Sequence, residues 1–222
     1  MSVLAPPSHA ELKARHRGER ENWASRDLSI RIHRALSWLG RADTETDDQD
    51  VRFLLLWVAF NAAYAGPITH ESVSEREAFR RYFGLLLICD RGRRIANAIH
   101  QRFSNEIRVL LANPYVYAPF WQHQAGDANS TEWQLWLERD NRAAQTALLS
   151  SETDRVLSII FGRLYVLRNQ LVHGGATWNS AINREQLRDG VRILAWLLPI
   201  FIDLMMDAPD ADWGALQYPV VD

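Results

Sequence analysis

Side chains suited to acid–base chemistry gather in one segment, Arg168-Asn169-Gln170-Leu171-Val172-His173. A guanidinium can hold a phosphate oxygen through paired N–H groups, and an imidazole that titrates near neutrality can give or take a proton. Asn169 can donate to a non-bridging oxygen or fix the orientation of the ring. RNA supplies its own nucleophile, the 2′-hydroxyl. One histidine and a set of phosphate-binding donors could therefore cleave RNA without a metal ion.

The pattern around this segment predicts a long helix over residues 151–173, because apolar residues recur there at helical spacing and Gly174-Gly175 is a strong stop signal. His173 then falls in the last turn, where the helix dipole favours the imidazolium form. One apolar stripe should face the core, and a second face gathers side chains such as Tyr165 and Asn169. A helix with two apolar faces is buried twice, and the second cover could be another copy of the chain.

The six-residue segment resembles the Arg-polar-x-x-x-His signature of the HEPN superfamily, whose members are bundles of four to six helices. In that family the motif lies late in the domain on a long helix, and a further helix follows. The resemblance covers residues 151–206. It implies that two chains pair through the helix over residues 151–173 as a homodimer, and that their two motifs share one cleft.

The resemblance also assigns roles within the motif. Arg168 would bind phosphate, His173 would serve as acid or base, and Asn169 would be the supporting polar residue. Active members cleave RNA without a metal or other cofactor and leave a 2′,3′-cyclic phosphate. We therefore expect a HEPN-type endoribonuclease with RNA as its partner, acting as a toxin or a defence component.

An earlier segment, residues 57–64, resembles an early-helix pattern of bacterial HEPN-like proteins. Aromatic residues at this helical spacing belong more often to a core than to a pocket. Asn61 is the exception, because a buried amide needs partners, and it could brace the motif helix. We treat Asn61 and Tyr64, with Arg163 and Tyr165 of the motif helix, as possible supporting or RNA-contacting residues.

The motif residues could also have purely structural roles. His173 could be a helix-terminal residue that the dipole favours, and Arg168 a surface arginine paired with an acid. HEPN-like domains also include members that keep the shape without the activity. The alternative function is a non-catalytic dimerisation or interaction module that binds RNA or a protein partner such as an antitoxin or a nucleotidyltransferase. A small-molecule sensor built on the tryptophan-rich bundle is a third alternative.

Composition limits the kind of partner. The 222 residues are 47% hydrophobic and 23% charged with a net charge of −2, so the chain is globular and has no general basic field for coating duplex DNA. A nucleic acid would have to be bound locally. Arg91, Arg93 and Arg94 could follow an RNA backbone, or they could lie on a solvated helix face.

Other classes of protein do not fit the sequence. Cys89 is the only cysteine, so an intrachain disulfide and a cysteine-rich zinc site are excluded. The longest apolar run, residues 193–202, is shorter than the ~20 residues that span a bilayer. The N-terminal residues lack the pattern of a signal peptide. We therefore expect a cytoplasmic protein without a membrane partner.

Strand signals are scarce and helical signals are frequent, which predicts an all-α fold, a single HEPN-like bundle of about six to seven helices over residues 19–206. Residues 1–18 are expected to be an N-terminal extension and residues 207–222 an irregular tail. An aromatic loop over residues 113–130 could stack bases, although packing onto the bundle is the commoner use of such a loop. The helices are expected at residues 19–39, 51–64 (capped by Asp50), 74–87 (with a capping box of Ser74 and Glu77), 93–111, 131–149, 151–173 and 183–206 (kinked at Pro199).

Overall fold

The computed structural model describes residues 4–66 and 75–220. Within these residues the chain forms ten α-helices, joined by short 3₁₀ and π segments, and no β-strand. The all-α prediction is confirmed, whereas the expected number of about six to seven helices is too small. The helices are α1 (His9–Glu19), α2 (Arg26–Thr44), α3 (Gln49–Tyr64), α4 (Glu75–Cys89), α5 (Arg94–Asn97), α6 (Ser104–Ala112), α7 (Ala118–Gln124), α8 (Trp133–Leu149), α9 (Thr153–Val172) and α10 (Arg184–Asp207).

Local capping accounts for an additional helix near the N-terminus. Ser8 and Glu11 form a reciprocal capping box that begins α1 inside the residues expected as an extension. Ser25 then accepts a hydrogen bond from the backbone N–H of Leu28 at 3.1 Å and begins α2. The helix expected over residues 19–39 therefore begins only at Arg26.

The cap of α3 is Asp48, whose carboxylate accepts a hydrogen bond from the backbone N–H of Val51 at 3.0 Å. Asp50, the expected cap, lies inside the first turn and is buried. The carboxylate of Asp50 is therefore available to a different part of the chain, beside the end of α9. The expected capping box of the next helix includes Ser74, which lies outside the described residues.

Two further expectations differ from the structure in the middle of the chain. The helix expected over residues 93–111 is divided into α5 and α6 by a π-helical segment, Ala98–Arg102. The aromatic segment expected as a loop contains the 3₁₀ turn Pro114–Val116 and the helix α7. These elements are too short for apolar periodicity to reveal them.

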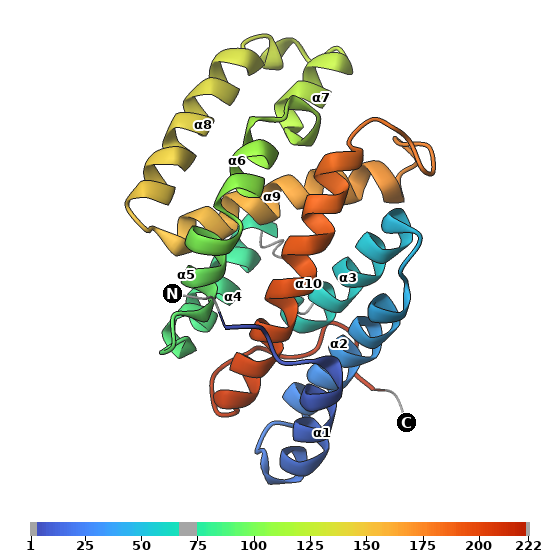
Figure 1. Cartoon of the computed structure of the whole chain (residues 1–222), viewed down its shortest axis with the longest axis vertical. Coiled ribbons are helices and arrows are strands. Elements are labelled where there is room, and N and C mark those ends of the chain that lie inside the picture. Colours follow the sequence, from blue (N-terminus) through green and yellow to red (C-terminus); the bar gives the residue numbers. More distant parts are fainter. Residues whose placement is uncertain (1–3, 67–74, 221–222) are drawn as a thin grey trace.

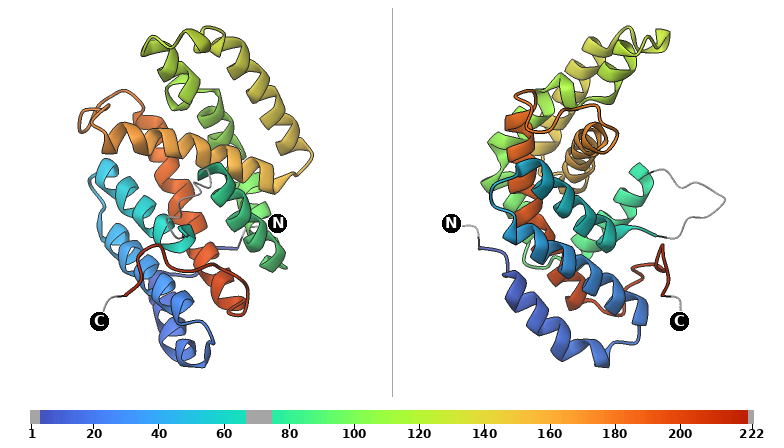
Figure 2. Two further views of the ribbon diagram at one scale, coloured as in Figure 1. Left: turned by 180° about the vertical axis from the view of Figure 1, so that it is seen from behind. Right: turned by 90° about the vertical axis from the view of Figure 1, so that its right-hand side faces the viewer.

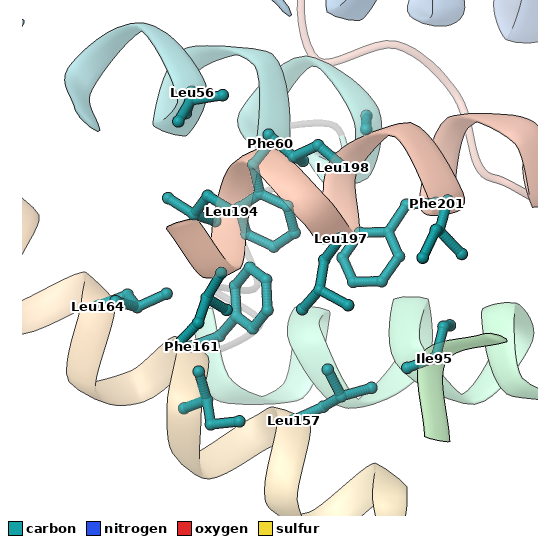
Figure 3. Packing of buried hydrophobic residues seen from close by; sticks show 14 of the residues in the cluster. Leu56, Phe60, Ile95, Leu157, Phe161, Leu164, Leu194, Leu197, Leu198 and Phe201 are labelled. Carbon is teal, nitrogen blue, oxygen red and sulfur yellow. The ribbon is translucent and has the colours of Figure 1, made fainter. Parts of the chain in front are cut away.

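The core forms where α3, α4, α9 and α10 meet, with α10 crossing the centre of the molecule (Figure 1). Phe60 of α3 and Phe161 of α9 point toward each other, with ring centroids 4.5 Å apart (Figure 3). Phe83 and Phe201 add rings to this cluster at 4.8 and 6.0 Å from Phe161. Packing of this kind fixes α9 firmly along its first three-quarters. None of the helices in the described ranges is long and apolar enough to cross a membrane.

Helix α9 has several neighbours. It packs against α3 and α4, and also against α6, α8 and the turn Pro114–Val116. In the view from behind, α9 runs across the near face of the molecule (Figure 2, left). Helices α7 and α8 lie at one end of the long axis and α1 lies at the other (Figure 1).

Arg31 of α2 ties the end of α3 to the C-terminal segment. Its side chain is 1% exposed, and its guanidinium donates to the carbonyls of Ala63 at 3.1 Å and Ala65 at 2.8 Å. It also donates to the carbonyls of Gly214 at 3.3 Å and Ala215 at 2.8 Å. The segment after α10 contains no regular helix or strand through residue 220, as expected, but this arginine anchors it.

Candidate functional site

The motif lies at the C-terminal end of α9, as the sequence predicts. The helix ends at Val172, and His173 follows as its cap residue, with its backbone N–H donating to the carbonyl of Asn169 at 3.0 Å. Gly174 has a φ of 70°, in the left-handed region that favours glycine. The helix therefore stops at this point, and the histidine is placed on its terminal turn.

Arg168 has no acidic partner among the side chains of residues 4–66 and 77–220, where no carboxylate lies within ion-pair distance of it. Its side chain is half-buried and donates to Oδ1 of Asn169 at 2.9 Å, and the guanidinium carbon lies 5.8 Å from the centre of the Tyr165 ring. Within these ranges the structure therefore gives Arg168 a neutral partner and not the acidic one that the alternative of a surface ion pair requires.

His173 is exposed, and its imidazole forms no hydrogen bond to any other described residue. Positions five residues apart on an ideal helix point about 140° away from each other. Arg168 and His173 of one chain therefore leave the end of α9 in different directions. One copy of α9 therefore does not aim an arginine and a histidine at the same phosphate.

The outward face of α9 is partly open, since two of its residues are exposed and two are half-buried. We define this face as Gly162, Val166, Asn169 and Val172, which recur at helical spacing along the helix. Gly162 is exposed, and a Cβ added there would meet no other segment within 4 Å. Val172 is 50% exposed. The face thus presents an exposed glycine and an exposed valine to solvent.

The segment that follows His173 is tied back to the start of α3. Asp50 is buried, and its carboxylate accepts hydrogen bonds from the backbone N–H of Asn179 at 3.1 Å and from Nη1 of Arg184 at 3.0 Å. Nε1 of Trp178 donates to Asp48 at 2.6 Å. These contacts fix the path of the chain between α9 and α10 and so limit the positions that His173 can take.

Gln170 joins three segments at the same place, although sequence reasoning gave it no role. Its Nε2 donates to the carbonyl of Tyr115 at 2.5 Å, and its Oε1 accepts from Nδ2 of Asn183 at 2.9 Å. Its backbone carbonyl accepts from the N–H of Ala176 at 3.1 Å. Gln170, Asn183 and Asp50 also line a small depression that is partly open to solvent. No local signal marks a glutamine as such a junction, because its partners come from distant segments.

Arg163 projects from a different side of α9 than the outward face, toward the segment after α6. It is 5% exposed, and its guanidinium carbon lies 4.2 Å from the centre of the Tyr117 ring. Burial lowers its pKa to about 10. The hydroxyl of Tyr117 donates to Asp140 at 2.8 Å, and burial together with this carboxylate raises the pKa of Tyr117 to about 12. In the described residues the N–H groups of Arg163 have no hydrogen-bond acceptor.

The remaining candidates lie in the core or at its edge. Tyr64 stacks on Phe60 with ring centroids 4.5 Å apart, and Tyr165 lies 6.1 Å from Trp57, so both rings pack between helices. The Oδ1 atom of Asn61 is buried and accepts no hydrogen bond within the described parts of the chain. Tyr165 contributes to the motif through Arg168, whereas Asn61 and Tyr64 lie on α3.

Part of the basic cluster is used within the fold. Arg94 pairs with Asp203 at 2.5 Å and with Asp207 at 3.1 Å, while Arg91 and Arg93 are exposed. Among the described residues, no group of three or more histidine, cysteine, aspartate or glutamate side chains is placed to hold a metal ion. Comparison with known proteins finds no matching family model, no similar curated protein and no similar solved structure.

Proposed function

We propose that this protein is a metal-independent endoribonuclease of the HEPN type, with its site at the C-terminal end of α9. One observation carries the proposal: the C-terminal end of α9 holds an exposed histidine and an arginine that has no acidic partner among the described side chains. An available guanidinium and a free imidazole are the groups that a phosphodiester requires for binding and proton transfer.

The chemistry uses the 2′-hydroxyl of the RNA as the nucleophile. The 2′-oxygen forms a bond to phosphorus and its proton passes to a neutral imidazole, while the bond from phosphorus to the 5′-oxygen breaks and that oxygen receives a proton from an imidazolium. The guanidinium of Arg168 holds the phosphate oxygens and Asn169 orients the guanidinium through its 2.9 Å hydrogen bond. The products carry a 2′,3′-cyclic phosphate and a 5′-hydroxyl.

Two copies of the chain complete the site in this proposal. One motif has a single histidine, whereas the reaction needs one proton acceptor and one proton donor. The outward face of α9 is partly open and contains an exposed glycine, so a second α9 can pack there and bring a second His173 to the same phosphate. The toxin or defence role belongs to this proposal.

Cleavage assays in a chelator test the reaction. Wild-type protein, His173→Ala and the control His33→Ala, which removes another exposed histidine, are incubated with a single-stranded RNA, and the product ends are analysed. We expect cyclic phosphate ends from the wild type and the control and no products from His173→Ala. Cleavage that persists in His173→Ala, or that the chelator abolishes, contradicts the mechanism.

Oligomeric state tests the shared site. Gly162→Arg places a long charged side chain on the outward face, where its Cβ meets open space, and Gly18→Arg does the same on α1 as a matched control. By light scattering we expect a dimer for the wild type and for Gly18→Arg, and a monomer without activity for Gly162→Arg. A fully active monomeric wild type would show that one chain suffices.

A non-catalytic interaction module is the second candidate, because apolar side chains surround the same site. Trp178 is 74% exposed and Ile182 is 65% exposed, on the segment that follows His173. Exposed side chains of this size often mark a surface that contacts another protein, such as an antitoxin or a nucleotidyltransferase. Chains that dimerise and bind a partner through Trp178, but leave RNA intact, would favour this function.

A further inference from the structure

Two aromatic side chains are exposed beside the candidate site. Tyr115 is 42% exposed and Trp121 is 37% exposed, with ring centroids 6.3 Å apart. They come from the turn Pro114–Val116 and from α7, the two elements that form the segment expected as a loop. Both rings therefore present part of their surface to solvent, where a ligand can reach them.

Both rings are held in place. Nε1 of Trp121 donates to the carbonyl of Tyr115 at 2.7 Å, which fixes the indole against the turn. Phe120 meets both rings edge to face, at 5.4 Å from Tyr115 and 5.0 Å from Trp121, and itself lies 5.0 Å from Trp133. The exposed pair therefore rests on half-buried rings and loses little freedom when a flat ligand binds.

A hydrogen bond connects this pair to the motif. The carbonyl of Tyr115 that receives the Trp121 indole also accepts from Nε2 of Gln170. Gln170 and His173 are three positions apart, so they lie on adjacent turns and about 60° apart around α9. This hydrogen bond therefore connects the aromatic pair to the end of α9, where we place cleavage.

A buried cation lies on the same side of α9. Arg163 and Gln170 are seven positions apart, which places them within about 20° of each other around the helix. The guanidinium of Arg163 stacks on Tyr117, two residues from Tyr115, and has no acceptor within the described residues. Stacking rings beside such a guanidinium favour a nucleotide over an apolar peptide.

We propose that Tyr115 and Trp121 form a stacking site for an unpaired base of a single-stranded RNA, next to the scissile phosphate. The inference rests on the proposed function for the identity of the strand, but it concerns binding and does not depend on turnover. The site takes any base, because each base offers a flat π-face, and it selects unpaired strands over duplexes, whose bases are not free to stack.

The test measures binding separately from cleavage. Full-length His173→Ala protein is titrated into a labelled single-stranded RNA and into copies with one abasic position moved along the strand, and fluorescence anisotropy gives Kd. We expect Trp121→Ala to weaken binding of the intact strand about tenfold. One abasic position should weaken binding by a similar factor when Trp121 is present and have no further effect when it is absent.

Control variants separate stacking from folding. Trp38→Ala removes a tryptophan of similar exposure on α2, 42%, and should leave Kd unchanged. Trp121→Phe keeps a ring and loses the indole N–H, so it should keep most of the affinity. Circular dichroism verifies that each variant retains its helical content.

The outcomes distinguish the two proposals. RNA that is cleaved and bound normally by Trp121→Ala overturns the stacking site and leaves the nuclease. Absence of RNA binding in every variant overturns both. A Trp121→Ala protein that binds RNA normally but changes its oligomeric state assigns the aromatic pair to a protein contact instead.

Discussion

Arg31 lies in α2 and His16 in α1, whereas Arg168 and His173 lie at the C-terminal end of α9. Arg31 is 1% exposed and donates to four backbone carbonyls, and His16 is 2% exposed with its Nε2 3.1 Å from the carbonyl of Ser29. Arg168 donates to a neutral partner, Asn169, and His173 stands in solvent.

The difference separates structural side chains from available ones. Burying a charge costs free energy unless polar atoms surround it, and Arg31 has those atoms from the end of α3 and from the C-terminal segment. The terminal N–H groups of Arg31 already donate to these acceptors, so they are not available to a ligand. Arg168 and His173 keep their hydrogen-bonding capacity, which is the condition for binding and proton transfer.

The largest effect should come from Arg168→Ala, which tests whether an available arginine acts on the substrate. We expect cleavage to fall about 100- to 1,000-fold, because removal of one donor to a transition-state oxyanion has an effect of this size. The free energy of unfolding should change by less than about 0.5 kcal/mol, since no ion pair within the described chain is lost. Activity assays and urea unfolding check both parts. Wild-type activity in this variant would remove the distinction between the two arginines.

Arg31→Met should lower stability and leave cleavage nearly unchanged, the opposite of Arg168→Ala. It leaves the carbonyls of Ala63, Ala65, Gly214 and Ala215 without their donor, so we expect a loss of about 2–3 kcal/mol in the free energy of unfolding. Residual activity per folded molecule should be close to that of the wild type. Urea unfolding gives the first quantity, and cleavage at a temperature where the variant is folded gives the second. A stable variant with reduced cleavage would contradict the structural role.

The pH dependence of stability should follow His16. Burial lowers its pKa from the ordinary value of 6.5, chiefly by desolvation, although the Ser29 carbonyl opposes this. Below about pH 6.5 the unfolded chain then binds a proton that the folded chain does not, so stability falls as pH falls. We expect a lower Tm at about pH 5.5 than at about pH 7.5, and a smaller difference in His16→Gln. His100, whose pKa burial also lowers, should account for part of the remainder. Equal differences in the variant and the wild type would exclude His16.

The smallest effect should come from Arg81→Ala. Arg81 pairs with Asp212 at 2.5 Å, but both side chains are exposed, so the pair should contribute less than about 0.5 kcal/mol to stability. Thermal unfolding of this variant beside Arg31→Met compares a surface contact with a buried one on the same C-terminal segment. If Arg81→Ala loses as much stability as Arg31→Met, burial does not determine how much each contact contributes to stability.

Local signals were sufficient for the helices that position the site. The glycines after His173 and the apolar periodicity predict residues 151–173 and 183–206, and the structure has Thr153–Val172 and Arg184–Asp207. The motif residues lie on the last turns of α9 as expected. Their role in RNA cleavage stays a prediction, because local pattern reports position and not reactivity.

Contacts between distant segments could not be predicted from the sequence. Arg94 resembled part of a free basic cluster, yet it pairs with Asp203, 109 positions further along the chain. Gln170 looked like a spacer in the motif, yet it connects to Tyr115, 55 positions earlier. Whether an arginine has an acidic partner depends on such contacts, and these follow from the packing of the whole chain.

The four hydrogen bonds of Arg31 cannot all form at the same stage of synthesis. Two of its four acceptors, Ala63 and Ala65, leave the ribosome soon after it, but Gly214 and Ala215 follow about 180 residues later. At ~5–20 residues per second this interval lasts on the order of ten seconds or more, during which α2 and α3 can pair while one side of the guanidinium still faces water. A nascent chain paused after α9 should therefore be more sensitive to proteases in α2 than the finished protein is.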